Sequence, residues 1–134
     1  KQAFLSYINM EKVPAIVVAA GPSLDQNINI IEKAKGKAFI IAVDSAIRLL
    51  EANGIEPDAF VTIDPIKPKV LFENQLAQKT PVFYCTHSSE EDLQLLHGMK
   101  IFCRTDEFIL EEIKQNEEEI NAGGNVASTA YSIA

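Results

Sequence analysis

Short apolar runs recur along this chain and alternate with segments whose apolar positions are spaced for helices. The runs are rich in β-branched residues and show no polar alternation, which is typical of parallel strands buried on both faces. They predict five strands, at Ala15–Ala20, Ala38–Val43, Ala59–Ile63, Pro81–Cys85 and Lys100–Arg104. Because helical segments separate the strands, the pattern predicts a Rossmann-like, doubly wound α/β domain with a mainly parallel sheet and helices on both faces.

Residues that favour helix ends stand between the predicted strands. Ser23 with Gln26, and Ser88 with Glu91, have the spacing of capping boxes, in which a hydroxyl accepts from a free backbone amide of the first turn. Glycine favours positions just past a helix C-terminus. The helices are predicted to start at Ser23, Ser45, Pro68, Ser88 and Thr105 and to end near Gly36, Asn53, Gln75 and Glu119.

Length, charge and cysteine content narrow the class of protein. A length of 134 residues suits one domain. Because the chain lacks an initial Met and ends inside a predicted helix, we interpret residues 1–134 as a single nucleotide-binding domain excised from a longer protein. The 12 basic and 19 acidic residues give a net charge of −7, which argues against nucleic acid as a partner. No apolar run approaches a membrane span of roughly 20 residues. Cys85 and Cys103 fall in predicted buried strands, and reduced thiols there indicate a cytoplasmic protein.

The first strand ends at the turn Gly21-Pro22-Ser23, which opens directly onto a predicted helix. Glycine allows close approach of a ligand to the backbone, and the free amides and dipole of a helix N-terminus favour a phosphate. The turn is neither a dinucleotide fingerprint nor a P-loop. It therefore predicts either a phosphate-binding loop for a nucleotide or only a tight turn with Ser23 as the helix N-cap.

Polar residues follow the other predicted strands, and parallel strands place them at the same edge of the sheet. Asp44 and Ser45 follow the second strand, where Asp44 either caps a helix or contacts a ribose or base. Asp64 follows the third strand, either as a sugar or metal ligand or as a turn residue before Pro65. His87 follows the fourth strand, either as an acid or base near neutral pH or as a solvated loop histidine.

A second glycine-led helix start lies near the end of the chain. Gly123 and Gly124 precede Asn125, which is a predicted N-cap with Ser128 at the third helical position. The two glycines suit either close approach to a charged ligand or a flexible connection. Two such helix starts in one sheet protein favour the interpretation that both face a common ligand.

Five spaced motifs together resemble the DUF115 or Maf-like family, the motility accessory factors of flagellated bacteria, which in turn resemble archaeal hydroxymethylpterin pyrophosphokinases. The resemblance covers the chain from about Val13 to Ala134. The motifs are Ile16–Asp25, Ala42–Ala46, Gly54–Asp58, Thr62–Pro65 and Gly123–Val126.

The resemblance implies a glycosyltransferase that moves a nonulosonic acid from a CMP-sugar to Ser or Thr hydroxyls of flagellin. It implies that the first turn holds the CMP phosphate, that the residues after the second strand border the nucleotide, and that the second glycine-led turn closes the opposite wall. The implied nucleotide- and phosphate-binding residues are Gly21, Pro22, Ser23, Asp44, Ser45, Gly123, Gly124 and Asn125. Asp64 would lie near the reacting sugar, and Asp64 or His87 would act as the base.

Two other functions stay open. In a pyrophosphokinase, Asp44 and Asp64 would hold Mg²⁺ on the phosphates of ATP, with a hydroxymethylpterin as acceptor. The lack of a lysine near Gly21 argues mildly against this, because a triphosphate would be poorly neutralised. The third hypothesis is a non-catalytic nucleotide-binding module for flagellar assembly. No metal ligand is predicted under the first and third hypotheses.

Overall fold

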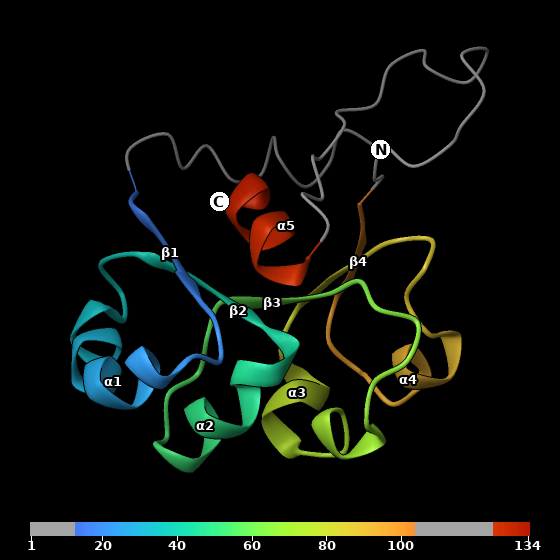
Figure 1. The fold of residues 1–134 in the computed structure, drawn as a ribbon, viewed down its shortest axis with the longest axis horizontal. Helices are drawn as coiled ribbons and strands as arrows, with labels where there is room; N and C mark the ends of the chain where they lie inside the picture. Colours follow the sequence, from blue (N-terminus) through green and yellow to red (C-terminus); the bar gives the residue numbers. More distant parts are fainter. Residues whose placement is uncertain (1–12, 104–124) are drawn as a thin grey trace.

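The computed structural model describes residues 13–103 and 125–134, which form a five-stranded parallel sheet with helices on both faces (Figure 1). The strands are β1 (Ala15–Val18), β2 (Phe39–Val43), β3 (Ala59–Thr62), β4 (Val82–Tyr84) and β5 (Lys100–Phe102). Each pairs in parallel with the next along the chain. The predicted parallel α/β sheet is confirmed, with strands shorter than expected; Arg104, the predicted end of the fifth strand, lies outside the described residues.

The interior strands β2 and β3 carry fully buried side chains. Ile40 and Ile41 of β2 and Phe60 and Val61 of β3 are 0% exposed. Full burial of an aliphatic or aromatic side chain contributes about 1.5–3 kcal/mol relative to an exposed one. These strands are therefore a firm base for the residues that follow them at the carboxyl edge of the sheet.

The helices lie in two layers around the sheet (Figure 1). On one face lie α1 (Pro22–Ala34), α2 (Ile47–Ala52), α3 (Gln75–Lys79) and α4 (Glu90–Gln94), and on the other lies α5 (Val126–Ile133), which contacts β1, β2 and β3. Right-handed crossovers between neighbouring strands taken in chain order place their helices on the same face. Strand order does not reverse among the five described strands, so the carboxyl edge as a whole indicates where a ligand would bind.

The first helix starts earlier than predicted. Gly21 is the N-cap of α1, Pro22 is the first helical residue, and no side chain caps the helix. Proline suits this position because its ring presets a helical φ and its missing N–H would be unpaired there in any case. The prediction that Ser23 caps the helix through a capping box with Gln26 was therefore wrong.

Two other predicted helices differ from the observed ones. The helix expected from Pro68 to Gln75 is a 3₁₀ turn, η2 (Lys69–Leu71), followed separately by α3. Asn74 accepts a hydrogen bond from the backbone N of Ala77 at 2.6 Å, so it caps a new helix instead of continuing the first. The helix expected over Ser45–Asn53 is a 3₁₀ turn, η1 (Asp44–Ala46), that leads into α2.

The predicted glycine positions after α1 and α2 are confirmed. Gly36 has φ +74° and Gly54 has φ +67°, a backbone region that disfavours other residues. Cys85 and Cys103 are buried and unpaired with each other, as expected for core thiols. The helix predicted from Thr105 to Glu119 lies outside the described residues.

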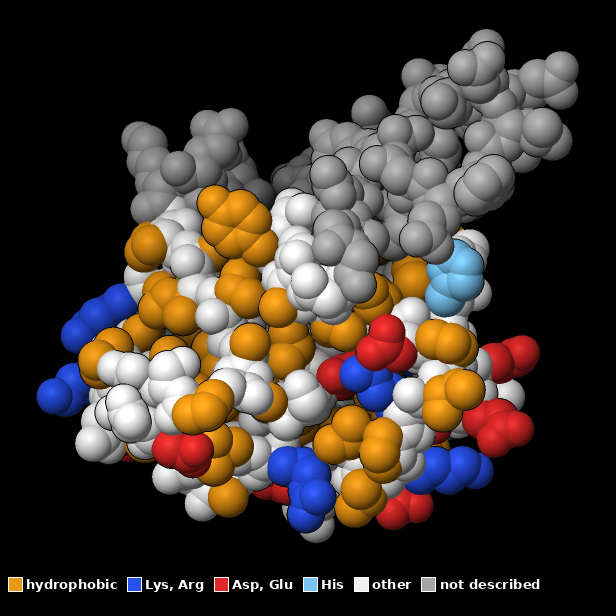
Figure 2. All heavy atoms as spheres, in the orientation of Figure 1, with side chains coloured by type: hydrophobic (Ala, Val, Ile, Leu, Met, Phe, Trp, Pro, Cys, Tyr) orange, Lys and Arg blue, Asp and Glu red, His pale blue; other side chains and the backbone are white. Residues whose placement is uncertain are grey.

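The surface of the described residues carries mixed charge. On the face shown in Figure 2, acidic and basic side chains are interspersed among hydrophobic ones. Among the helices that the structure describes, none is long and apolar enough to cross a lipid bilayer.

Candidate functional site

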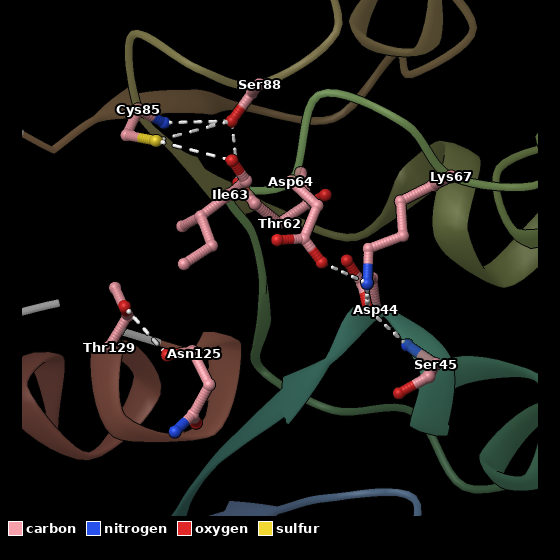
Figure 3. A network of polar contacts seen from close by, with 10 residues as sticks. All are labelled: Asp44, Ser45, Thr62, Ile63, Asp64, Lys67, Cys85, Ser88, Asn125 and Thr129. Atoms are coloured by element: carbon pink, nitrogen blue, oxygen red, sulfur yellow. Dashed lines mark hydrogen bonds and ion pairs between the residues drawn. The ribbon is translucent and has the colours of Figure 1, made fainter. Parts of the chain in front are cut away.

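Three neighbouring strands deliver polar residues to the carboxyl edge of the sheet (Figure 3). Asp44 directly follows β2, and Asp64 lies two residues beyond β3. The turn after β4 carries Ser88. Because β2, β3 and β4 are parallel neighbours, these residues meet at one edge, as the sequence predicted.

Asp44 is a buried carboxylate that is only partly paired. Its side chain is 1% exposed, and its Oδ1 accepts a hydrogen bond from the backbone N of Ser45 at 2.7 Å. Its Oδ2 is buried and has no hydrogen-bond partner within the described part of the chain. A buried polar atom without a partner costs about 1–3 kcal/mol. Oδ2 of Asp44 is therefore an acceptor at the carboxyl edge that is available to a hydrogen-bond donor of a ligand.

Burial raises the pKa of Asp44 above its ordinary value. The charge of Lys67, the nearby Thr62 hydroxyl and the Ser45 amide act in the opposite direction and lower this pKa, but they do not cancel the effect of burial. The carboxyl group of Asp44 therefore depends on its neighbours to stay ionised.

Lys67 joins the two carboxylates. Its Nζ lies 2.6 Å from Oδ2 of Asp64 and 3.3 Å from Oδ1 of Asp44 (Figure 3). Partial burial on its own lowers the pKa of Lys67, but the hydrogen bond with Asp64 and the charge of Asp44 raise it above the ordinary value. Lys67 is thus held as an ammonium ion. We call Asp44, Asp64 and Lys67 the charged cluster; with all three ionised it carries one net negative charge.

Sequence reasoning missed Lys67. The signal was present: Lys67 stands three residues after Asp64, in a segment with Pro65 and Pro68. Prolines restrict the backbone of such a segment and limit the directions its side chains take. A lysine at this spacing after a strand-terminal Asp is a candidate partner for any carboxylate that the adjacent strand delivers to the same edge.

The turn after β1 leaves the start of α1 open. Gly21 has φ −110° and ψ 165°, so it is not in the left-handed region. A Cβ built on Gly21 would come no closer than 3.8 Å to any neighbour, namely Oγ of Ser23. The fold itself therefore does not demand glycine here. Pro22 has no N–H, and the backbone N of Leu24 donates to the carbonyl O of Gly21 at 2.9 Å, so the amide of Ser23 is the group at the start of this 13-residue helix that suits an anion.

The other predicted site residues take different places. Ser45 is exposed beside Asp44, and His87 is exposed on the turn after β4. Asn125 caps α5 by accepting from the backbone N of Ser128 at 2.9 Å, which confirms that prediction. Among the described residues, no hydrogen bond or ion pair joins Asn125 to the charged cluster. Gly123 and Gly124 lie outside the described residues.

Ser88 has a different role from the one predicted. Ser89 caps α4 instead, accepting from the backbone N of Asp92 at 3.2 Å. The hydroxyl of Ser88 donates to the carbonyl O of Thr62 at 2.8 Å and accepts from the backbone N of Cys85 at 3.0 Å. The prediction of a Ser88 capping box was therefore wrong, because this hydroxyl ties the end of β3 to the turn after β4.

A family model, a sequence relative and a solved structure are similar to this chain. A family model described as "6-hydroxymethylpterin diphosphokinase MptE-like" matches residues 1–134. An uncharacterized protein of Treponema pallidum (strain Nichols) is 39% identical over 51 residues, which are 38% of this chain and 24% of that protein. The structure of a Maf glycosyltransferase from Magnetospirillum magneticum AMB-1 superposes with a TM-score of 0.68 at 17% identity, over 88% of this chain and 20% of that one.

These matches differ in what they establish. The structural likeness shows that the two proteins share a fold, and the chain spans only about a fifth of that glycosyltransferase and a quarter of the Treponema protein. The family model matches the chain over its whole length. The chain belongs to the MptE-like family, as its spaced motifs suggested.

Proposed function

We propose that this domain binds a nucleotide-activated sugar and transfers the sugar to a protein hydroxyl. In detail, the donor is a CMP-nonulosonic acid and the acceptor is a Ser or Thr of flagellin, reached in the cytoplasm. The likeness in fold to a Maf glycosyltransferase supports the reaction class. The observation that carries the proposal is the adjacency of two features at paired strands: the uncapped start of α1 after β1, and the partly unpaired Asp44 after β2.

The two features suit the two ends of a nucleoside monophosphate. The amide and the hydroxyl of Ser23 bind the CMP phosphate at the start of α1, where the helix dipole favours negative charge. Asp44 and Ser45 border the nucleoside. Oδ2 of Asp44 accepts a hydrogen bond from a ribose hydroxyl, because in other nucleotide-binding parallel sheets an acidic residue in this region binds the ribose. Asn125, the N-cap of α5, closes the opposite wall.

Besides binding the donor, the protein must stabilise the departing CMP and accept the proton of the acceptor hydroxyl. The bond between the anomeric carbon and the phosphate oxygen breaks, and the acceptor oxygen forms the new bond to that carbon. The start of α1 stabilises the charge that develops on the departing CMP. Asp64, which lies in an ion pair with Lys67, accepts the proton of the acceptor hydroxyl. His87, exposed on the turn after β4, is the other candidate for this base.

A titration of the purified protein with CMP, CDP, ATP and GTP, each with and without Mg²⁺, tests the proposal. We expect CMP to bind without metal and Ser23→Ala to weaken that binding. Gln26→Ala is the matched control, because Gln26 is also exposed on α1 but lies beyond its first amides. Equal CMP affinity in Ser23→Ala and the wild type would contradict the assignment of the phosphate site.

One observation favours a second function. The family description names a hydroxymethylpterin diphosphokinase, which would transfer diphosphate from ATP to a pterin hydroxymethyl group. A preference for ATP with Mg²⁺ over CMP in the same titration would replace the first proposal with this one. If CMP binds but Asp64→Asn and His87→Ala leave the sugar transfer of the protein unchanged, the domain is a non-catalytic nucleotide-binding module.

A further inference from the structure

The charged cluster bears on whether the site uses a divalent cation. A diphosphokinase of the kind that the family description names would need Mg²⁺ on its nucleotide phosphates, and Asp44 and Asp64 are the strand-end carboxylates placed to hold it. In the structure, the Nζ of Lys67 instead lies between them, 3.3 Å from one carboxylate and 2.6 Å from the other.

The residues present do not fit a divalent ion. Mg²⁺ takes near-octahedral oxygen ligands at about 2.0–2.1 Å, and a bound ammonium at the same place excludes it by both volume and charge. Within the described ranges, no group of three or more His, Cys, Asp or Glu side chains is placed to hold a metal ion. The two carboxylates are thus already neutralised in part by the protein itself.

Charge balance points the same way. The charged cluster carries one net negative charge with Lys67 in place, so it repels a polyphosphate instead of attracting it. Under the proposed function, a single phosphate binds at the start of α1, which follows β1 and lies one strand away from Asp44. This arrangement favours a nucleoside monophosphate ester over a metal-bound triphosphate.

We propose that Lys67 is a built-in cation that takes the place of a divalent metal between Asp44 and Asp64, so that the site binds its nucleotide without metal. Lys67 acts here as a positioning residue: it keeps Asp44 ionised in its buried position and orients Asp64 toward the edge of the sheet. The inference rests on the proposed function for the identity of the nucleotide. Its central claim, the exclusion of metal by Lys67, is tested without any nucleotide.

Direct titration with Mn²⁺, followed by the electron paramagnetic resonance signal of the free ion, tests that claim. We expect no Mn²⁺ site at the charged cluster in the wild type or in Lys67→Arg, which keeps the positive charge. We expect Lys67→Gln to gain affinity of about tenfold or more, because it frees two carboxylates and removes a positive charge. The gain must disappear in Lys67→Gln combined with Asp64→Asn, which separates this site from surface binding elsewhere.

Two results would overturn the inference. Wild-type protein that binds Mn²⁺ and loses it in Asp64→Asn would show that the carboxylates are metal ligands despite Lys67. A folded Lys67→Gln variant with no gain would show that Lys67 does not occupy a cation site. A circular dichroism melt establishes that the variant is folded, and Lys67→Asn, which is also neutral and polar, serves in its place if Lys67→Gln does not fold.

CMP titration in EDTA and in Mg²⁺ separates this inference from the proposed function. We expect the CMP affinity to agree within about twofold in the two buffers, and a tenfold gain with Mg²⁺ would overturn the metal-free site. If CMP binds in neither buffer, the proposed function fails, while the Mn²⁺ titration still decides the role of Lys67.

Discussion

Two groups of polar residues lie side by side at the carboxyl edge, and they differ in how completely they are paired (Figure 3). Between β3 and β4, Ser88 satisfies the carbonyl of Thr62 and the amide of Cys85, and the thiol of Cys85 lies 3.6 Å from the carbonyl O of Ile63. Between β2 and β3, the charged cluster holds three ionisable groups and leaves Oδ2 of Asp44 without a partner.

The difference separates a structural role from a functional one. A neutral network whose groups are paired stabilises the turn after β4 and needs no hydrogen bond from a ligand. A buried carboxylate that is only partly paired costs stability, and such a cost is retained in folded proteins where a group serves binding or chemistry. We therefore expect substitutions in the two groups to separate stability from ligand binding.

The largest effect on stability is expected for Lys67→Met. This change leaves Asp44 buried without its cation, and removal of one partner from a buried ion pair destabilises by about 3 kcal/mol or more. Urea denaturation at neutral pH measures the free energy of unfolding. The double variant Lys67→Met with Asp44→Asn should recover much of the loss, because it removes the uncompensated charge. A loss that is the same with Asp or Asn at position 44 would show that Lys67 acts through packing alone.

A smaller loss of stability, about 1–2 kcal/mol, is expected for Ser88→Ala. The substitution removes the hydrogen bond to the carbonyl of Thr62 and the one from the amide of Cys85. Ser45→Ala is the matched control, since its hydroxyl is exposed at the same edge, and it should change the free energy of unfolding very little. CMP affinity should be unchanged in Ser88→Ala; a clear drop would assign this neutral network to the ligand site as well.

The same contrast explains what the sequence could predict. Hydrophobic periodicity is a local signal, and it located the strands because buried parallel strands are apolar on both faces. It also placed Asp44 and Asp64 at one edge, because parallel strands end together. The pairing of both with Lys67 depends on how β2 and β3 lie next to each other, which no local pattern contains.

The errors at helix starts have a similar origin. Ser23 and Ser88 both have capping-box spacing. With Pro22 as the first helical residue, the N-cap of α1 is Gly21, two residues before Ser23, and Ser89 instead of Ser88 caps α4. Ser88 was drawn instead to a carbonyl 26 residues earlier in the chain. Capping propensity predicts which residue types can cap a helix from the local sequence alone. Which of two adjacent serines caps α4 depends on the hydrogen bond between Ser88 and Thr62, which are distant in the sequence.

The smallest effect on the free energy of unfolding is expected from a change of pH. This effect reports on Asp44 alone within the charged cluster. Because burial raises its pKa in the folded protein above the ordinary value of 3.8, the folded state binds the extra proton. The contribution of Asp44 to stability therefore decreases as pH rises from about 3.8 through the folded-state pKa, and is constant above it. Urea denaturation at a series of pH values, compared between the wild type and Asp44→Asn, measures this term directly. The wild type should lose stability relative to Asp44→Asn across that window. If the wild type gained stability relative to Asp44→Asn as pH rises, Lys67 and the amide of Ser45 would stabilise the ionised carboxylate more than burial destabilises it. The contacts of the charged cluster would then stabilise the fold, as those of the neutral network around Ser88 do.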